Sequence, residues 1–299
     1  MEKYITADRI ANAICQDVQF KGCSVLVEGK KDRKLYGKFI NNESARIVET
    51  FGKYTQRDAY KILSDRGFVR KIGIRDADFL RIPGNVKFDP NYADEIFPTD
   101  FHDSEIMAIS YGALSKFISI ILDEESVLRF EMKLGLKFQD VIFNLAYHLG
   151  CLKLADKKHG LGLSFKPEKV DGNRLKLHKF ICFKSANFLG NELMVNTVFE
   201  YSKNRGKIVK QRQEIAEKLD MILKNKLPLL EIVNGHDVCE IILMLSKDGL
   251  QSSNKILQTP DCVEDMLRLA FDKSDFAKTN LVALLQQWQS KTGMKIFRD

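Results

Sequence analysis

The chain contains, at Cys23-Ser24-Val25-Leu26-Val27-Glu28-Gly29, a short apolar run that ends in a carboxylate and a glycine. A basic segment with helical spacing follows at 30–40. A second apolar run, at 68–75, ends in Asp76-Ala77-Asp78. Short apolar runs bounded by turn residues are typical of buried strands, and strands that alternate with helices build parallel sheets. These segments therefore predict the first strands and helix of an α/β domain.

The same pattern continues outward and then changes. We expect strands at 23–27, 45–48, 68–75 and 96–99, helices at 6–19, 30–40 and 54–65, a loop at 81–94, and a helix from 103. After about residue 110 we expect helices at 117–122, 124–134, 138–155, 191–224 with a break at Gly206, 237–246, 262–271 and 276–290, and short β-like pieces within 161–189. The predicted fold class is α/β, with an N-terminal parallel sheet flanked by helices (residues 1–110) followed by a mostly α-helical region (residues 111–299).

Composition narrows the class of protein. A hydrophobic content of 44% over 299 residues suffices for real cores, and no stretch approaches the ~20 apolar residues needed to span a bilayer. The N-terminus lacks an apolar signal core, so we expect a cytoplasmic protein without membrane attachment. The six cysteines form no C-x-x-C pair and are interpreted as buried reduced thiols, which disfavours a zinc site.

The net charge of +7 is unevenly distributed along the chain. Residues 1–150 contain 22 basic and 22 acidic side chains, whereas residues 151–299 contain 25 basic and 18 acidic ones. A neutral half that carries a carboxylate cluster is thus followed by a basic half. This suits a catalytic module joined to a module that binds a polyanion, although a solvated lysine-rich surface would give the same count.

Carboxylates follow three of the predicted strands. Because the carboxyl ends of parallel strands meet at one edge of a sheet, we expect Glu28, Asp76 and Asp78 to converge. Clustered carboxylates repel one another unless a cation neutralises them, and oxygen ligands favour Mg²⁺ or Mn²⁺ over zinc. The fourth strand end adds candidate ligands, Asp103 and Glu105 with Asp100, although Asp103 is also well placed to cap the next helix. The sequence thus predicts a metal site suited to phosphodiester chemistry, with Glu28 as its catalytic carboxylate.

Basic residues and histidines supply further candidates. Basic side chains beside the predicted metal site could grip phosphates, and a second basic run, placed on one helix, could follow a phosphate backbone. The predicted nucleic-acid-binding residues are Lys30, Lys31, Lys34, Lys203, Arg205, Lys207, Lys210 and Arg212. His102 within the acidic run and His236 before Asp237 are possible accessory residues, although His236-Asp237 also fits a buried histidine followed by a helix cap.

Two sets of residues carry a family resemblance. Val25-Leu26-Val27-Glu28-Gly29-x-x-Asp32, followed by Ile74-Arg75-Asp76-Ala77-Asp78, resembles the Toprim fold of topoisomerases, primases and OLD-type nucleases. Thr99-Asp100-x-His102-Asp103-x-Glu105 and Asn234-Gly235-His236-Asp237 are similar to a bacterial Toprim-like effector nuclease family, which includes the effector component of the PARIS anti-phage defence system. The Toprim motifs cover about residues 20–110.

The resemblance implies a function as well as a fold. It implies that Glu28 binds metal or moves a proton, that Asp76 and Asp78 hold Mg²⁺, and that Glu105 belongs to the same site. It further implies a nuclease effector that cleaves RNA, such as tRNA, or DNA when released from an ATPase partner. The chain has no Walker A sequence, so the ATPase would be a separate protein. We also expect an active homodimer.

Two other interpretations stay open. The domain could be a non-catalytic Toprim-like binding module that regulates a partner ATPase, which the joint presence of Glu28, Asp76 and Asp78 disfavours. It could also be a topoisomerase-like or primase-like nucleotidyl transferase, although no active-site tyrosine signature and no zinc-binding primase module can be placed.

Overall fold

The computed structural model describes residues 5–83, 95–167 and 172–298 and divides the chain into two compact units. The first unit, the sheet unit, combines the described residues up to 80 with 95–113 and 268–298. The second, the helical unit, combines 81–83 with 114–267. The boundary near 110 predicted from the sequence lies close to the observed one. The predicted assignment of all of 111–299 to one domain is wrong, because the C-terminal segment returns to the sheet unit.

The sheet unit is built on four parallel strands. They are β1 (Cys23–Val27), β2 (Ala45–Glu49), β3 (Lys71–Arg75) and β4 (Ile96–Pro98), in the order β2-β1-β3-β4. Strand β1 is buried along its length and β3 at every residue except Arg75, as parallel strands covered on two faces should be. The α/β class predicted from the sequence is therefore confirmed. Of the predicted loop at 81–94, residues 84–94 lie outside the described residues.

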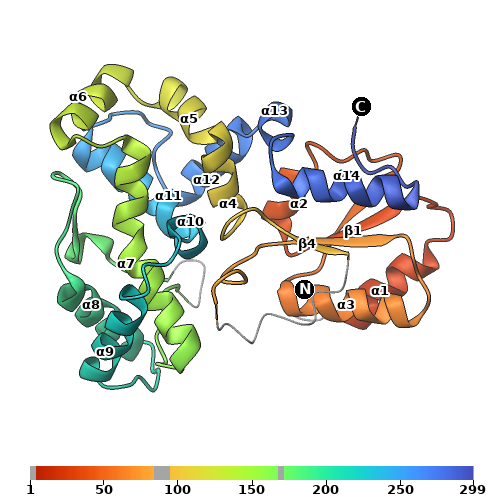
Figure 1. Cartoon of the computed structure of the whole chain (residues 1–299), viewed down its shortest axis with the longest axis horizontal. Coiled ribbons are helices and arrows are strands. Elements are labelled where there is room, and N and C mark those ends of the chain that lie inside the picture. The colour runs from red at the N-terminus through yellow and green to blue at the C-terminus, as the bar shows by residue number, and fades with distance from the viewer. Residues whose placement is uncertain (1–4, 84–94, 168–171, 299) are drawn as a thin grey trace. The chain divides into compact units, whose positions relative to one another are not determined.

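Helices cover both faces of this sheet (Figure 1). One face carries α1 (Ala7–Gln16) and α3 (Lys53–Asp65), and the other carries α2 (Lys30–Tyr36) and α14 (Asn280–Thr292). Three short helices complete the unit, α4 (Ser104–Ala108), the π-helical η3 (Ile109–Ala113) and α13 (Lys273–Phe276). Helix α2 is shorter than the predicted 30–40, and the single predicted helix at 276–290 is two helices.

A buried glutamine ties two strands together beside their carboxyl ends. Gln56 on α3 is 1% exposed, and its Nε2 donates to the carbonyl oxygens of Leu26 at 2.9 Å and Ile74 at 2.8 Å. Each of these residues lies two positions before a carboxylate, Glu28 or Asp76. The Gln56 bridge therefore fixes the two strand ends that present those side chains.

The helical unit is organised around one long helix, α7 (Phe138–His159), which is buried on several sides and packs against neighbours throughout its length. Helix α10 approaches α7 closely at Gly150, which has no side chain. A Cβ at this position would lie only 2.4 Å from the carbonyl oxygen of Ile232. The other elements of this unit are α5 (Leu114–Ile121), α6 (Glu124–Leu134), η4 (Leu177–Lys179), β5 (Ile181–Cys182), β6 (Asn187–Phe188), α8 (Asn191–Lys203), α9 (Arg212–Leu223), α10 (Leu229–Ile232), α11 (Gly235–Met244) and η5 (Leu245–Gly249). Helix α12 (Pro260–Ala270) runs across the boundary between the units.

Two expectations about composition can be compared with the structure. All six cysteines are free, and Cys23, Cys151 and Cys239 are buried while the other three are half-buried. Among the described residues, one helical stretch, Ser104–Ile121, is long and apolar enough to cross a membrane, and 50% of it is buried within the structure. Gly112, with a φ of +128°, interrupts the regular helix there. A core helix of a soluble protein passes the same test, so this stretch is weak evidence for a membrane span.

Candidate functional site

The carboxyl edge of the sheet gathers acidic side chains, as the sequence predicts. Glu28 follows β1, and Asp76 follows β3. The parallel register places Val27 beside Ile74 and Ile74 beside Phe97, so the ends of β1, β3 and β4 lie next to one another. We call the set at this edge the acidic cluster; its members are Glu28, Asp32, Asp76, Asp78, Asp103 and Glu105.

Glu28 has an unusual environment for a carboxylate. Its Oε1 is buried and has no hydrogen-bond partner in the part of the chain that the structure describes. Burial raises the pKa of Glu28, and the nearby charge of Asp78 raises it further. Arg75, Lys53 and a hydrogen bond from the Asp76 backbone act in the opposite direction. A buried carboxylate oxygen that lacks a partner is costly, and a cation or a bound water would remove that cost.

Asp76 is the most strongly perturbed member of the cluster. Its Oδ1 accepts a hydrogen bond from the Ser104 backbone N–H at 3.0 Å, which links the end of β3 to the start of α4. Burial raises the pKa of Asp76 well above its ordinary range, and the charges of Asp32, Asp103 and Glu105 add to this increase. The carboxylates therefore lie close enough to repel one another.

Asp32 belongs to the cluster although it lies on α2. Its Oδ2 accepts a hydrogen bond from the Gly29 backbone N–H at 2.9 Å, which fixes the turn between β1 and α2. Burial raises the pKa of Asp32 to about 7, with further contributions from Glu105 and Glu28. A carboxyl group that titrates near neutrality can hold or release a proton under physiological conditions.

Two cations that sequence reasoning missed pair with members of the cluster. Lys53 Nζ lies 2.6 Å from Asp78 Oδ2, and Arg268 Nη2 lies 3.3 Å from Glu105 Oε1. The latter pair is largely buried, with side chains that are 8% and 12% exposed. Lys53 directly follows Gly52 in the turn after β2, and this position at a strand end is the local signal that could have indicated it. Arg268 lies 163 residues from Glu105, so no local pattern could have revealed it.

Asp103 and Asp100 have structural roles. Asp103 caps α4, because its Oδ1 accepts from the Ile106 backbone N–H at 3.0 Å. Asp100 accepts from the backbone N–H groups of Asn280 at 2.7 Å and Leu281 at 2.9 Å, and from the Tyr111 hydroxyl at 2.6 Å. Asp100 thereby neutralises the N-terminus of α14 and differs from the acids of the cluster.

Tyr36 is a second residue that the sequence did not single out. It is 1% exposed, and its hydroxyl has no hydrogen-bond partner among the described residues. Burial raises the pKa of Tyr36 well above its ordinary value, and the charges of Asp32 and Asp76 raise it further. The spacing of Asp32 and Tyr36, four residues apart on α2, is the local signal that could have indicated a shared face.

The residues fit a divalent cation in their chemistry but not in their present arrangement. In the described residues, no group of three or more His, Cys, Asp or Glu side chains is arranged to hold a metal ion. Lys53 and Arg268 instead neutralise Asp78 and Glu105. The donor set is nevertheless all oxygen, its members repel one another, and Glu28 Oε1 lacks a partner. A Mg²⁺ or Mn²⁺ ion would relieve both costs after side-chain rotation.

The basic residues predicted to bind nucleic acid are on the surface, but they do not form one helical stripe. Lys30, Lys31 and Lys34 are exposed on α2. The run at 203–212 is not a single helix, because α8 ends at Lys203 and α9 begins at Arg212. Gly206, with a φ of +68°, is the predicted break. The predicted placement of this basic run on one helix is therefore wrong.

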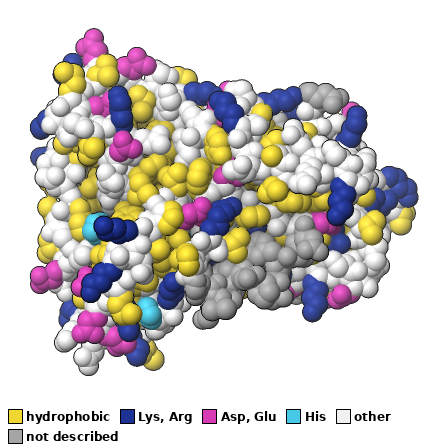
Figure 2. All heavy atoms as spheres, viewed as in Figure 1, with side chains coloured by type: hydrophobic (Ala, Val, Ile, Leu, Met, Phe, Trp, Pro, Cys, Tyr) yellow, Lys and Arg dark blue, Asp and Glu magenta, His cyan; other side chains and the backbone are white. Residues whose placement is uncertain are grey.

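Two members of this basic run make ion pairs within the helical unit. Arg212 pairs with Glu200 and lies 4.0 Å over the ring of Phe199, and Lys210 lies 3.5 Å from Glu214. On the face that Figure 2 shows, basic and acidic side chains are interspersed. Positive charge therefore forms no continuous patch on that face.

The two candidate histidines lie in different units. His102, in the sheet unit, is 2% exposed and packs edge-on against Phe79 with ring centroids 4.7 Å apart. His236, in the helical unit, forms a hydrogen bond through Nδ1 with the buried Glu264. One interpretation of the sequence expected Asp237 to cap α11. Asp237 lies within that helix instead, and it pairs with Lys153 at 2.5 Å. His236 is therefore a partly exposed member of a separate charged cluster.

Comparisons with known proteins add no identification. No family model matches this chain, and no curated protein matches it.

Proposed function

We propose that this chain is a metal-dependent nuclease that cleaves phosphodiester bonds at the acidic cluster. The observation that carries the proposal is the convergence of Glu28, Asp32 and Asp76 at the carboxyl edge of a parallel sheet, with all three pKa values raised. Mutual repulsion of this kind is a cost in a structural role, whereas it is the expected property of a site that binds a divalent cation.

The side chains of the cluster have separable tasks in this proposal. Asp76 and Asp78 would hold Mg²⁺ or Mn²⁺ with Glu105, and the ion would supply charge stabilisation and a nucleophilic water. Glu28, whose Oε1 has no partner among the described residues, would take a proton from that water. Lys53 and Arg268, which pair with Asp78 and Glu105, would supply positive charge for the phosphate.

The biological setting is proposed from the family resemblance and the charge distribution. The chain would act in the cytoplasm as an effector of a bacterial anti-phage defence system, held inactive by an ATPase partner and active as a homodimer. The basic half, with 25 basic and 18 acidic residues at 151–299, suits a nucleic-acid substrate, either RNA such as tRNA or DNA.

Glu28→Gln tests the proposal, because glutamine keeps the size of the side chain and removes its charge and basicity. Purified wild-type protein is incubated with total RNA and with plasmid DNA, in Mg²⁺ and in EDTA. We expect cleavage of one substrate in Mg²⁺ and its loss, by about 10²–10⁴-fold, in the variant. Glu43→Gln, at an exposed acid of the same unit, is the matched control.

A different result would redirect the proposal. Equal cleavage by wild type and Glu28→Gln would exclude the acidic cluster as the active site. If neither cleaves, the assay is repeated with the co-expressed ATPase partner, and inactivity there would overturn the nuclease assignment.

A non-catalytic binding module is the second candidate function. It is favoured by the pairing of Asp78 with Lys53 and of Glu105 with Arg268, which satisfies two acids without a metal ion. Titration calorimetry with Mn²⁺ separates the two candidates. Stoichiometric binding that is lost in Asp76→Asn favours the nuclease, and absence of binding favours the binding module.

A further inference from the structure

A pocket of the helical unit lies between α8 and the segment that leads into η4. It has a volume of about 510 Å³, within the range of small-molecule sites. One wall is formed by Thr197 and Tyr201 on α8 and by Asn204 at its C-cap; they lie four and three residues apart and so share one helix face. On the adjacent face of α8, Met194 and Val198 are buried, whereas Thr197 and Tyr201 are half-buried and face the pocket.

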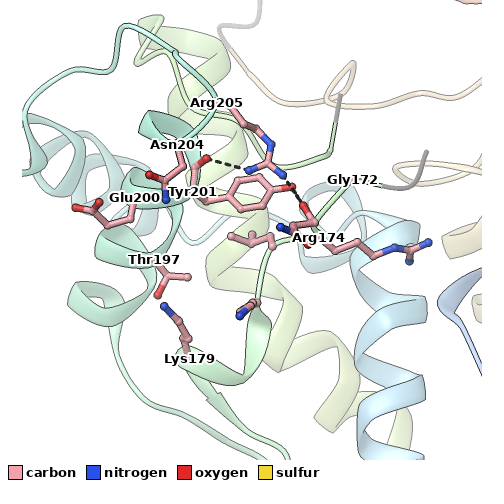
Figure 3. A pocket seen from close by; sticks show the side chains of 11 residues that line it. Gly172, Arg174, Lys179, Thr197, Glu200, Tyr201, Asn204 and Arg205 are labelled. Atoms are coloured by element: carbon pink, nitrogen blue, oxygen red, sulfur yellow. Dashed lines mark hydrogen bonds between the residues drawn. The ribbon is translucent and has the colours of Figure 1, made fainter. Parts of the chain in front are cut away.

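The pocket is held open by a set of hydrogen bonds. Arg205 lies 3.5 Å over the ring of Tyr201 and donates to the Tyr201 carbonyl oxygen at 3.1 Å and to that of Asn173. The Tyr201 hydroxyl donates to the same Asn173 carbonyl at 3.0 Å. Figure 3 shows Arg205 and Tyr201 side by side at one end of the pocket. These contacts fix a planar cation stacked on an aromatic ring before any ligand arrives.

Positive charge also lines the pocket. Lys176 and Lys179 line it and are exposed, and Lys179 lies near Thr197 in Figure 3. Arg174 also belongs to the lining, but its guanidinium extends away and pairs with Asp261 at 2.8 Å. The acid of the lining, Glu200, pairs with Arg212. Lys176 and Lys179 are therefore the cations available to a ligand.

We infer that this pocket binds one nucleotide unit, with its phosphate on Lys176 and Lys179 and its base against the Tyr201–Arg205 stack. Aromatic rings and arginine planes are the usual platforms for unpaired bases, and lysines contact phosphates as point charges. Thr197, near Lys179, supplies a hydroxyl for a sugar, and Asn204, next to Tyr201, supplies an amide for a base edge. The inference rests on the proposed function only for the source of the nucleotide, which would be the polynucleotide substrate.

The test measures binding by the full chain in the Glu28→Gln background and in EDTA, so that no cleavage occurs. The probes are fluorescent 12-nucleotide RNA and DNA strands, followed by anisotropy across a salt series, with AMP and ATP as competitors. Lys176→Gln with Lys179→Gln is compared with Lys133→Gln and Lys224→Gln, two exposed lysines of the same unit that lie outside the pocket. Both double variants remove the same charge.

We expect the pocket variant to bind the strand at least tenfold more weakly and to lower the slope of log affinity against log salt by about 0.7, the value for one lost phosphate contact on a single strand. The control should keep the parent slope. Tyr201→Ala should weaken binding about tenfold, and Tyr201→Phe, which keeps the ring, less than threefold. Competition by AMP or ATP would show that free nucleotides enter the pocket, and competition by longer strands only would assign it to the polynucleotide.

Three results would overturn the inference: no binding by the parent protein, equal losses in the two lysine variants, or unchanged affinity in Tyr201→Ala. Thermal unfolding of each variant excludes loss of fold as the cause. The nuclease assay remains a separate measurement. If wild type cleaves and the pocket variants bind normally, the pocket proposal is rejected and the nuclease proposal stands. If wild type does not cleave and the pocket variants bind weakly, the pocket proposal stands and the nuclease proposal is rejected.

Discussion

The acidic cluster of the sheet unit and the pocket beside α8 both gather like charges, yet they differ in how far those charges are buried. In the cluster, burial and mutual repulsion raise the pKa values of Glu28, Asp32 and Asp76. In the pocket, Lys176 and Lys179 are exposed. Buried charges depend on pH and on counter-ions bound at the site, whereas exposed charges depend on bulk salt. The comparison therefore predicts a pH- and metal-sensitive sheet unit and a salt-sensitive helical unit.

The largest effect should follow from Asp76→Asn. Activity in Mg²⁺ should fall by about 10²–10⁴-fold, because a ligand carboxylate is lost. Without metal the same variant should be more stable than wild type, by about 1–3 kcal/mol, because it removes the most strongly repelled charge of the cluster. Urea unfolding in EDTA, beside the nuclease assay, measures both.

Opposite signs for activity and stability are the signature of a functional acid. Asp65→Asn, at an exposed acid on α3, is the matched control and should change neither quantity appreciably. If Asp76→Asn destabilises the metal-free protein instead, the hydrogen bond to Ser104 outweighs the repulsion, and the acids would be structural.

The stability of the metal-free protein should decrease as the pH rises. The pKa of Asp32 is about 7 in the folded protein against an ordinary 3.8, so between these values the folded state binds more protons than the unfolded state. Below about pH 4, Asp32 does not change the free energy of unfolding. Above pH 7 it lowers the free energy of unfolding by up to about 4 kcal/mol. The raised pKa values of Glu28 and Asp76 act in the same direction.

Thermal unfolding from pH 5 to 8 in EDTA, for wild type and Asp32→Asn, isolates this contribution. The variant should show the weaker decrease with pH. Added Mg²⁺ should restore stability at pH 8 and have little effect at pH 5, where protons already neutralise the cluster. Parallel pH profiles for the two proteins would mean that Asp32 titrates normally.

Asp100→Asn should behave in the opposite way to Asp76→Asn. Asp100 accepts two backbone hydrogen bonds at the start of α14 and one from Tyr111, so loss of its charge should destabilise the fold by about 2 kcal/mol in EDTA and in Mg²⁺ alike. Urea unfolding of this variant provides the value. A stabilised Asp100→Asn protein would place Asp100 in the cluster after all.

Asp76 and Asp100 show which parts of the site could be predicted from the sequence. Glu28 and Asp76 were predictable because each directly follows an apolar strand, and parallel strands must align their carboxyl ends. Asp100 has the same local pattern, but its partners on α14 lie 180 residues away. Arg268 was hidden for the same reason. Tertiary contacts between distant segments leave no periodicity, and the return of the C-terminal segment to the sheet unit supplied the contacts that the sequence missed.

The helical unit teaches a related lesson about charge runs. Five basic residues in ten positions suggested one helical stripe, but Gly206 interrupts the helix, and Arg205 and Arg212 lie on aromatic rings. Density of charge in sequence therefore did not translate into a surface stripe. The lysines that line the pocket, Lys176 and Lys179, come instead from a segment whose sequence pattern indicated only short β-like pieces.

The smallest effect should come from Arg212→Gln. Its pair with Glu200 is exposed on both sides, so its loss should cost less than about 1 kcal/mol of stability, mostly through the contact with Phe199. Strand affinity should fall less than in the Lys176→Gln, Lys179→Gln variant, because Arg212 already has an anionic partner. Urea unfolding and the same anisotropy titration measure both quantities. If Arg212→Gln instead produced the larger loss of affinity, the nucleic acid would follow the run at 203–212. The basic surface to compare with the buried acidic cluster would then be that run, and not the pocket.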